Sequence, residues 1–396
     1  MPRNVVALSA VSLLNDTSSE IIYPLLPAFL ALAVGASPFA IGLIEGFAES
    51  LASLLKLVSG YLSDRLGTRK MPVLLGYAVA ALTRPLLGFV GSWPGVLVLR
   101  SADRIGKGIR GAPRDAIIAS SVSVERRGAA FGFNRAADHL GAVFGPVAAF
   151  FLLTYFAADP SSPSVAEYQR TFLFASLPVI AGLFVIAAFV RDEPEGRRSE
   201  ASPSLSFSGF DKNFWRLMGV VALFTLSNST DAFLLLRAAE AGISPAVLPL
   251  LWMTLHFSKV VSSLAGGVMS DKLGRKPVIA SGWLIYALVY LGFAFVSSAW
   301  QCWALFIIYG AYFGLTEGVE KAFVADLVGE DKRGTAYGIY NLAYGITVLP
   351  ASLLFGFLWY EFGAATAFIA SAAVSMTALA MFLTVKGAAA KAAEAN

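Results

Sequence analysis

The feature that most constrains this chain is a series of long apolar stretches that recurs from one end to the other. A helix needs about 20 residues, at 1.5 Å each, to cross a hydrocarbon core roughly 30 Å thick. Twelve stretches of that kind can be read in the 396 residues, at approximately 5–33, 39–63, 72–92, 95–120, 127–156, 171–190, 214–241, 245–270, 277–298, 301–327, 334–360 and 364–386. The sequence therefore predicts an all-α integral membrane protein with twelve transmembrane helices.

Composition agrees with a membrane protein and argues against several other classes. Hydrophobic residues make up 57% of the chain and charged residues only 14%, where a soluble protein carries about 25% charged residues. The net charge of +4 gives no reason to expect a nucleic-acid partner. The one cysteine and the two distant histidines predict no metal site. We find no nucleophile elbow and no phosphate-binding loop, so we expect neither an enzyme nor a cofactor.

The distribution of Lys and Arg predicts the orientation in the bilayer. Basic residues concentrate in alternate loops, at 65–70, 126–127, 191–212, 272–276 and 332–333, while the short loops on the other side hold almost none. Basic loops stay on the cytoplasmic side of a membrane. Both termini are therefore expected in the cytoplasm, and the simplest location is the bacterial cytoplasmic membrane.

The chain repeats itself at about half its length. Asp64 and Asp271 lie in similar loops 207 positions apart (271 minus 64), and other motifs recur at 206 or 207 positions. This period predicts two six-helix bundles, at 1–190 and 214–396. Between them, 191–213 is rich in charge, Ser, Pro and Gly and is expected to be a cytoplasmic linker.

Three motifs resemble those of the major facilitator superfamily. The loop at 60–70 reads Gly-x-Leu-x-Asp-Arg-x-Gly-x-Arg-Lys, and a shorter copy lies at 267–276. Arg104-Ile-Gly-Lys107-Gly108 resembles the Arg-x-x-Gln-Gly of proton antiporters, with Lys in place of Gln. The segment from Gly141 to Pro146 resembles the Gly-x-x-x-Gly-Pro element of exporters. The resemblance implies the twelve-helix fold and a secondary active transporter that couples proton entry to efflux of a small amphipathic or charged organic compound by alternating access.

The loop and glycine motifs allow two interpretations each. We favour a conformational latch in the signature loops, with a simple topology anchor as the alternative. The latch residues are Gly60, Asp64, Arg65, Gly67, Arg69, Lys70, Asp271, Gly274 and Arg275. Gly141 and Gly145 allow close helix packing and Pro146 favours a kink. That element either helps to seal a central cavity or is only a tightly packed structural helix.

Charged residues inside the apolar spans are the strongest candidates for function. Each costs about 2.5–3.5 kcal/mol in hydrocarbon, so such groups usually face a bundle interior. The candidates for proton coupling or a substrate cavity are Asp16, Glu20, Glu45, Glu49, Arg104, Lys107, Arg110, Arg135, Asp231, Glu317 and Glu320. We expect Asp16 or Glu20 to alternate between protonated and substrate-bound states, with Arg104 opposite. For each single charge, a structural ion pair is the alternative.

The substrate and the direction stay open. The many basic residues favour an anionic or zwitterionic solute, whereas Glu20, Glu45 and Glu49 favour a cation. Two other functions compete with proton-coupled efflux: a proton-coupled uptake symporter for a polar or anionic metabolite, and a membrane sensor that transports nothing. The expected partners are a small-molecule substrate and the lipid bilayer, and the expected functional form is a monomer.

Overall fold

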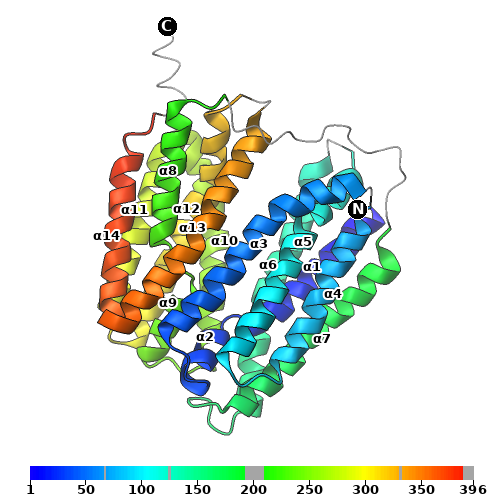
Figure 1. Cartoon of the computed structure of the whole chain (residues 1–396), viewed down its shortest axis with the longest axis vertical. Coiled ribbons are helices and arrows are strands. Elements are labelled where there is room, and N and C mark those ends of the chain that lie inside the picture. The colour runs from blue at the N-terminus through cyan, green and yellow to red at the C-terminus, as the bar shows by residue number, and fades with distance from the viewer. Residues whose placement is uncertain (67, 124–125, 192–208, 330–331, 387–396) are drawn as a thin grey trace. The chain divides into compact units, whose positions relative to one another are not determined.

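The computed structural model consists of helices and connecting loops in the residues that it describes, as predicted. It describes residues 1–66, 68–123, 126–191, 209–329 and 332–386, apart from the side chains of residues 57, 60–66 and 264. Within this part of the chain there are fourteen α-helices, one π-helical segment and no β-strand (Figure 1). Each of the twelve predicted spans corresponds to one helix or to one interrupted helix.

The helices of the first six spans are α1 (Arg3–Ile22) with α2 (Leu26–Ala28) and the π-helical η1 (Phe29–Ala33), then α3 (Pro38–Leu66), α4 (Lys70–Leu87), α5 (Trp93–Ser120), α6 (Arg127–Phe156) and α7 (Val165–Phe189). Those of the last six spans are α8 (Lys212–Ser227) with α9 (Ala232–Glu240), then α10 (Leu248–Leu273), α11 (Arg275–Ala294), α12 (Ala299–Asp326), α13 (Arg333–Phe362) and α14 (Ala364–Phe382).

Spans one and seven are interrupted, which the apolar pattern does not predict. The first ends as an α-helix at Ile22, just before Pro24, because proline lacks an N–H donor. The seventh breaks between Ser227 and Ala232, where a side chain competes with the helical ladder: Thr230 Oγ1 accepts from the Ala232 N–H. Asp231, a candidate residue, therefore lies at the start of α9 and not in the middle of a continuous helix.

Nine helical segments in the described residues are long and apolar enough on their own to cross a membrane. The helix α5 falls short because it carries seven charged residues: Arg100, Asp103, Arg104, Lys107, Arg110, Arg114 and Asp115. A span with this many charges needs partners on neighbouring helices. Those partners lie on α1, α3 and α4.

The chain divides into two compact units. The first contains the described residues up to 191 together with Ile243–Met253, and the second contains 209–242 and the residues from Thr254 onward. In the first unit α1 packs on α6 and α7, and α5 packs on α3 and α4. In the second, α11 packs on α12 and α14, and α8 packs on α13 and α14. The predicted bundle limits, and the linker that lies largely outside the described residues, stay a prediction.

The two units have different interiors. Aliphatic side chains such as Val5, Leu8 and Ile186 dominate a core of the first unit. The second unit is packed with aromatic rings: Tyr286 stacks on Tyr290 with ring centroids 4.2 Å apart, and many further ring pairs surround them. Tyrosine brings a hydroxyl into an apolar core, so the second unit has polar groups without net charge.

Candidate functional site

Two carboxylates on α3 face two guanidinium groups on α5, one helical turn apart on each helix. In the first pair, Arg100 donates from Nε to Glu45 Oε1 at 2.8 Å and from Nη2 to Oε2 at 3.0 Å. The two side chains are only 4% and 6% exposed. A buried bidentate pair satisfies both charges and both hydrogen-bonding faces. We therefore interpret Glu45 as a structural residue.

The second pair has the same residue types but is open. Arg104 Nε lies 3.8 Å from Glu49 Oε2, beyond hydrogen-bond distance, and the side chains are 14% and 34% exposed. The sequence predicts Arg104 opposite Asp16, but the structure places it against Glu49, because α5 packs along α3 at this level. Lys107, about one turn further along α5, is exposed and interacts electrostatically with both Glu49 and Asp16.

Arg84 on α4 is a buried cation that links three helices. Its Nε donates to Asp103 Oδ1 at 3.1 Å, and its side chain is 3% exposed. Its Nη1 and Nη2 donate to the carbonyl and the Oδ1 of Asn15 on α1, at 2.9 and 3.1 Å. Arg110 adds another bond to Asn15 Oδ1 at 3.2 Å and donates to the Gly76 carbonyl at 3.1 Å. The network fixes α1 against α4 and α5.

Asp16 lies at the end of this network. Two guanidinium groups donate to Asn15 Oδ1, so the Asn15 amide must direct its NH₂ group elsewhere. That group donates to Asp16 Oδ1 at 2.9 Å. The carboxylate of Asp16 is thus oriented by a neutral donor, while the guanidinium groups of Arg84 and Arg110 bond to the oxygen of the same Asn15 amide.

Glu20 also accepts from a neutral donor. The indole of Trp252 donates from Nε1 to Glu20 Oε2 at 2.7 Å. The Trp252 ring lies 5.0 Å from the ring of Tyr23, and the Arg100 guanidinium lies 5.4 Å from that same Tyr23 ring. Trp252 belongs to the segment Ile243–Met253, which packs with the first unit. The first part of α10 thereby supplies a hydrogen-bond donor to an acid on α1.

The glycines of α6 lie directly against the acidic part of α1. A Cβ at Gly141 would fall 2.8 Å from the Leu13 carbonyl oxygen, and one at Gly145 would fall 2.5 Å from Glu20 Cβ. Pro146 is buried, and α6 continues through it. The motif therefore sets how closely α6 approaches α1 beside Asp16 and Glu20.

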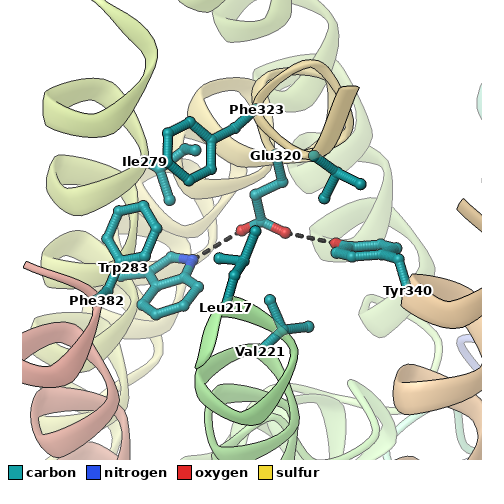
Figure 2. Close-up of a pocket in the computed structure, with 9 residues that line it drawn as sticks. Leu217, Val221, Ile279, Trp283, Glu320, Phe323, Tyr340 and Phe382 are labelled. Atoms are coloured by element: carbon teal, nitrogen blue, oxygen red, sulfur yellow. Dashed lines mark hydrogen bonds between the residues drawn. The ribbon is translucent and has the colours of Figure 1, made fainter. Parts of the chain in front are cut away.

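Two acids of the second unit, Asp231 and Glu320, are held by tyrosine and tryptophan. Tyr309 donates from its hydroxyl to Asp231 Oδ1 at 2.7 Å. Glu320 accepts from Trp283 Nε1 at 2.7 Å and from the Tyr340 hydroxyl at 2.6 Å. Figure 2 shows the Glu320 carboxylate between these two donors in a small pocket that is otherwise lined mainly by apolar side chains, including Leu217, Val221, Ile279, Phe323 and Phe382.

Two candidates lie apart from these clusters. Arg135 on α6 is 66% exposed, and its nearest recorded acid, Asp138, is 3.9 Å away. Glu317 on α12 is exposed, whereas Glu320, three residues further on, is not. Among the side chains that the structure describes, no three His, Cys, Asp or Glu residues are grouped so that they could hold a metal ion.

The signature loops are described in part. Gly67 lies outside the described residues, as do the side chains of Asp64 and Arg65 and the burial of Gly60. Arg69 donates to Ser120 Oγ at 3.4 Å, and Lys70 donates to the Ala187 carbonyl at 3.3 Å.

In the second copy, Gly274 has a φ of +87°, which favours glycine. The next residue, Arg275, pairs with Asp326 at 2.7 Å and donates to the Ala322 carbonyl. Asp271 is exposed. In both copies the described basic residues at the start of one helix bind residues near the end of another helix of the same unit.

Sequence reasoning missed Arg84 and Trp252. Arg84 could have been found, because it is a charge inside the apolar span 72–92 and buried charges need partners. Trp252 carries no comparable signal, since a tryptophan in a membrane span usually serves packing. Its contact with Glu20 joins residues 232 positions apart and is a product of the tertiary fold.

Helices that cross a bilayer many times, with ionisable side chains turned toward one another inside helical units, define a multi-pass membrane transporter and not an enzyme. Comparison with known proteins agrees. The chain belongs to the Major Facilitator Superfamily, whose family model matches residues 8–254 and 217–395.

Its relatives include other members of the family. It is 36% identical over 369 residues to an uncharacterized MFS-type transporter, MJ1317, of Methanocaldococcus jannaschii, with 91% of this chain and 89% of the relative covered. It is 25% identical over 373 residues to the class C tetracycline resistance protein of Escherichia coli, with 88% of each covered. The crystal structure of the nucleoside transporter NupG superposes with a TM-score of 0.82 at 13% identity and covers 96% of this chain and 99% of that one.

Proposed function

We propose that this transporter exports a small amphipathic or charged organic compound across the bacterial cytoplasmic membrane in exchange for protons. Asp16 and Glu20 on α1 are the proposed coupling groups. The similarity to a tetracycline resistance protein supports the outward direction. So does the Gly141 to Pro146 element, which resembles that of exporters.

The observation that carries the proton coupling is the chemical nature of the partner that each buried acid has. Glu45 and Asp103 are bound by guanidinium groups, which stay charged. Protonation of either acid would leave a buried cation without its counter-ion, which costs several kcal/mol. These two acids are therefore assigned to structure.

Asp16 and Glu20 are bound differently. Each accepts a hydrogen bond from a neutral group, the Asn15 amide and the Trp252 indole. A neutral donor can bond to the carboxylate or to the carbonyl oxygen of the protonated acid without creating an unpaired charge. Protonation of either acid can thus leave this hydrogen bond in place, which is what a coupling group needs.

The driving force is sufficient for such an exchange. One proton that crosses 100 mV supplies about 2.3 kcal/mol, and each pH unit adds about 1.4 kcal/mol. At 100 mV and a gradient of one pH unit, exchange of one proton for one neutral solute sustains a ratio of about 500-fold between the solute concentrations on the two sides, since each 1.4 kcal/mol is a factor of ten.

The test uses proteoliposomes with an imposed pH gradient, in which proton flux is followed with a trapped pH-sensitive dye. Tetracycline, ethidium and benzoate are added in turn. We expect a compound-dependent proton flux in the wild type that is abolished by Asp16→Asn combined with Glu20→Gln. Asp159→Asn, in a connecting loop, is the control and should leave the flux unchanged. Equal flux in the double variant and the wild type would contradict the proposal, and the sidedness of compound movement decides between export and uptake.

A further inference from the structure

The two ion pairs between α3 and α5 form a ladder whose two rungs differ. Both consist of one glutamate and one arginine, and the positions advance by four on each helix: Glu45 with Arg100, then Glu49 with Arg104. The first rung is closed, with two hydrogen bonds of 2.8 and 3.0 Å. The second has a shortest recorded ion-pair distance of 3.8 Å. Since the residue types are identical, the difference reflects the surroundings of the second rung.

Arg104 has unused hydrogen-bonding capacity. Its Nε is buried and bonds to no acceptor among the described residues. A guanidinium group offers five N–H donors in a fixed planar fork that matches a carboxylate or a phosphate. An unsatisfied buried donor is costly. The Arg104 side chain is therefore suited to donate hydrogen bonds to an anionic group of a bound molecule.

Lys107 extends the same positive surface. It follows Arg104 by about one turn of α5, is exposed, and makes no hydrogen bond or ion pair with the part of the chain that the structure describes. An ammonium group in the middle of a membrane helix is expected to face water or a solute and not lipid. Glu49 is the acid beside both cations and is 34% exposed, so it can move away.

From these observations we propose that Arg104 and Lys107 form a binding site for the carboxylate or phosphate group of an organic anion, and that Glu49 occupies the site as a counter-ion until the anion displaces it. Glu45 and Arg100 form the rigid rung that holds α3 and α5 together beside this site. The inference rests on the proposed function only in taking the bound anion as cargo, since binding itself needs no proton gradient.

The test compares four probes that share one ring and differ in charge: benzoate, phenyl phosphate, benzamide and benzylamine. Binding is measured by isothermal titration calorimetry on purified protein in phosphatidylcholine nanodiscs, without a gradient. We expect benzoate or phenyl phosphate to bind at least tenfold more tightly than benzamide, and benzylamine not to bind. Absence of binding by both anions, or preference for benzylamine, would overturn the site.

The variants give opposite signs, which separates ligand binding from general destabilisation. Arg104→Gln should weaken anion binding by about 10- to 100-fold, the range for loss of hydrogen bonds to a charged group. Lys107→Gln should weaken it several-fold. Glu49→Gln removes the competing carboxylate and should tighten binding about tenfold. The matched variant Glu45→Gln should lower the melting temperature without tightening binding.

Two results would contradict the assignment even if an anion binds. Equal tightening by Glu45→Gln and Glu49→Gln would mean a general charge effect, with no specific counter-ion in the site. Loss of benzoate binding when half of the lipid is replaced by phosphatidylglycerol would assign the site to a lipid headgroup and not to a solute. If the wild-type protein binds the anion but shows no compound-dependent proton flux in proteoliposomes, the proposed function is refuted and the anion site is not.

Discussion

Replacing Arg84 by methionine tests whether the buried network around Asn15 stabilises the first unit. The substitution keeps much of the side-chain volume and removes three hydrogen bonds, to Asp103 and to the side chain and carbonyl of Asn15. It also leaves the carboxylate of Asp103 buried without its closest cation. Breaking a buried pair from one side costs about 3–5 kcal/mol.

This energy translates into a large thermal shift. In a unit of about 200 residues, each kcal/mol lowers the melting temperature by about 2–4 °C. Arg84→Met should therefore lower the melting temperature by about 10 °C in detergent at a fixed heating rate. Asp103→Asn breaks the same pair from the other side and should cost a similar amount, about 3–5 kcal/mol, because it leaves the Arg84 cation buried without its counter-ion. Arg135→Met, at a side chain that is 66% exposed, should shift the melting temperature by no more than about 2 °C.

A double-mutant cycle of Arg84→Met and Asp103→Asn tests whether the two residues stabilise the protein as a pair. The variant with both Arg84→Met and Asp103→Asn should be hardly less stable than Arg84→Met alone, because the buried carboxylate is no longer charged. Strictly additive losses would mean that the two residues do not act on each other. A shift under 2 °C for Arg84→Met would show that the network contributes nothing to stability and would remove the basis for assigning Asp103 to structure.

Three further predictions concern single contacts. Gly145→Ala should destabilise the protein by about 1–3 kcal/mol, measured as a lower melting temperature, because the new Cβ would lie 2.5 Å from Glu20 Cβ. The control is Gly132→Ala on the same helix. Its new Cβ meets nothing within 4 Å, so this variant should be neutral or stabilising. Glu320→Leu should destabilise the protein by about 2–4 kcal/mol, because it leaves Trp283 Nε1 and the Tyr340 hydroxyl without their acceptor. The loss of the bond to Trp283 should also shift the tryptophan fluorescence emission. The control Glu317→Leu should change neither the stability nor the emission. The Arg275 and Asp326 side chains are 31% and 35% exposed, so their coupling energy in a double-mutant cycle should stay below about 1 kcal/mol and fall further at high salt.

The helices were predictable and their charge partners were not, for a physical reason. A membrane helix satisfies its backbone within itself, so an apolar run of sufficient length is enough to predict it. Span five, for example, is predicted at 127–156 and observed as α6 over the same residues. The breaks near Pro24 and Thr230 depend on local backbone bonds that hydropathy does not register.

Pairing of charges depends on which helices become neighbours. The sequence shows that acids and bases are spaced on single faces of spans one, two and four, but several pairings are compatible with that spacing. The alternative of Arg104 against Asp16 or against Glu49 is decided by the packing of α5 along α3. The proposed anion site depends on the open second ion pair, Arg104 with Glu49. Its nitrogen–oxygen distance is about 1 Å longer than that of the first pair, Arg100 with Glu45. A pattern of residue types in the sequence cannot predict a difference of this size.

The two halves of the repeat place different polar residues at corresponding positions. At an offset of 206 positions, Arg84 corresponds to Tyr290 and Asp103 to Tyr309. In the first unit this place holds an ion pair; in the second it holds tyrosines, one of which donates to Asp231. One residue beyond Asp103 on α5, the buried Nε of Arg104 bonds to no acceptor among the described residues. The tyrosines supply polarity without a fixed charge, so a carboxylate among them can be neutralised without stranding a cation. Asp231 and Glu320 in the second unit are then further acids, besides Asp16 and Glu20, that a proton can neutralise with little loss of structure. The second test of coupling therefore lies at Asp231→Asn and Glu320→Gln.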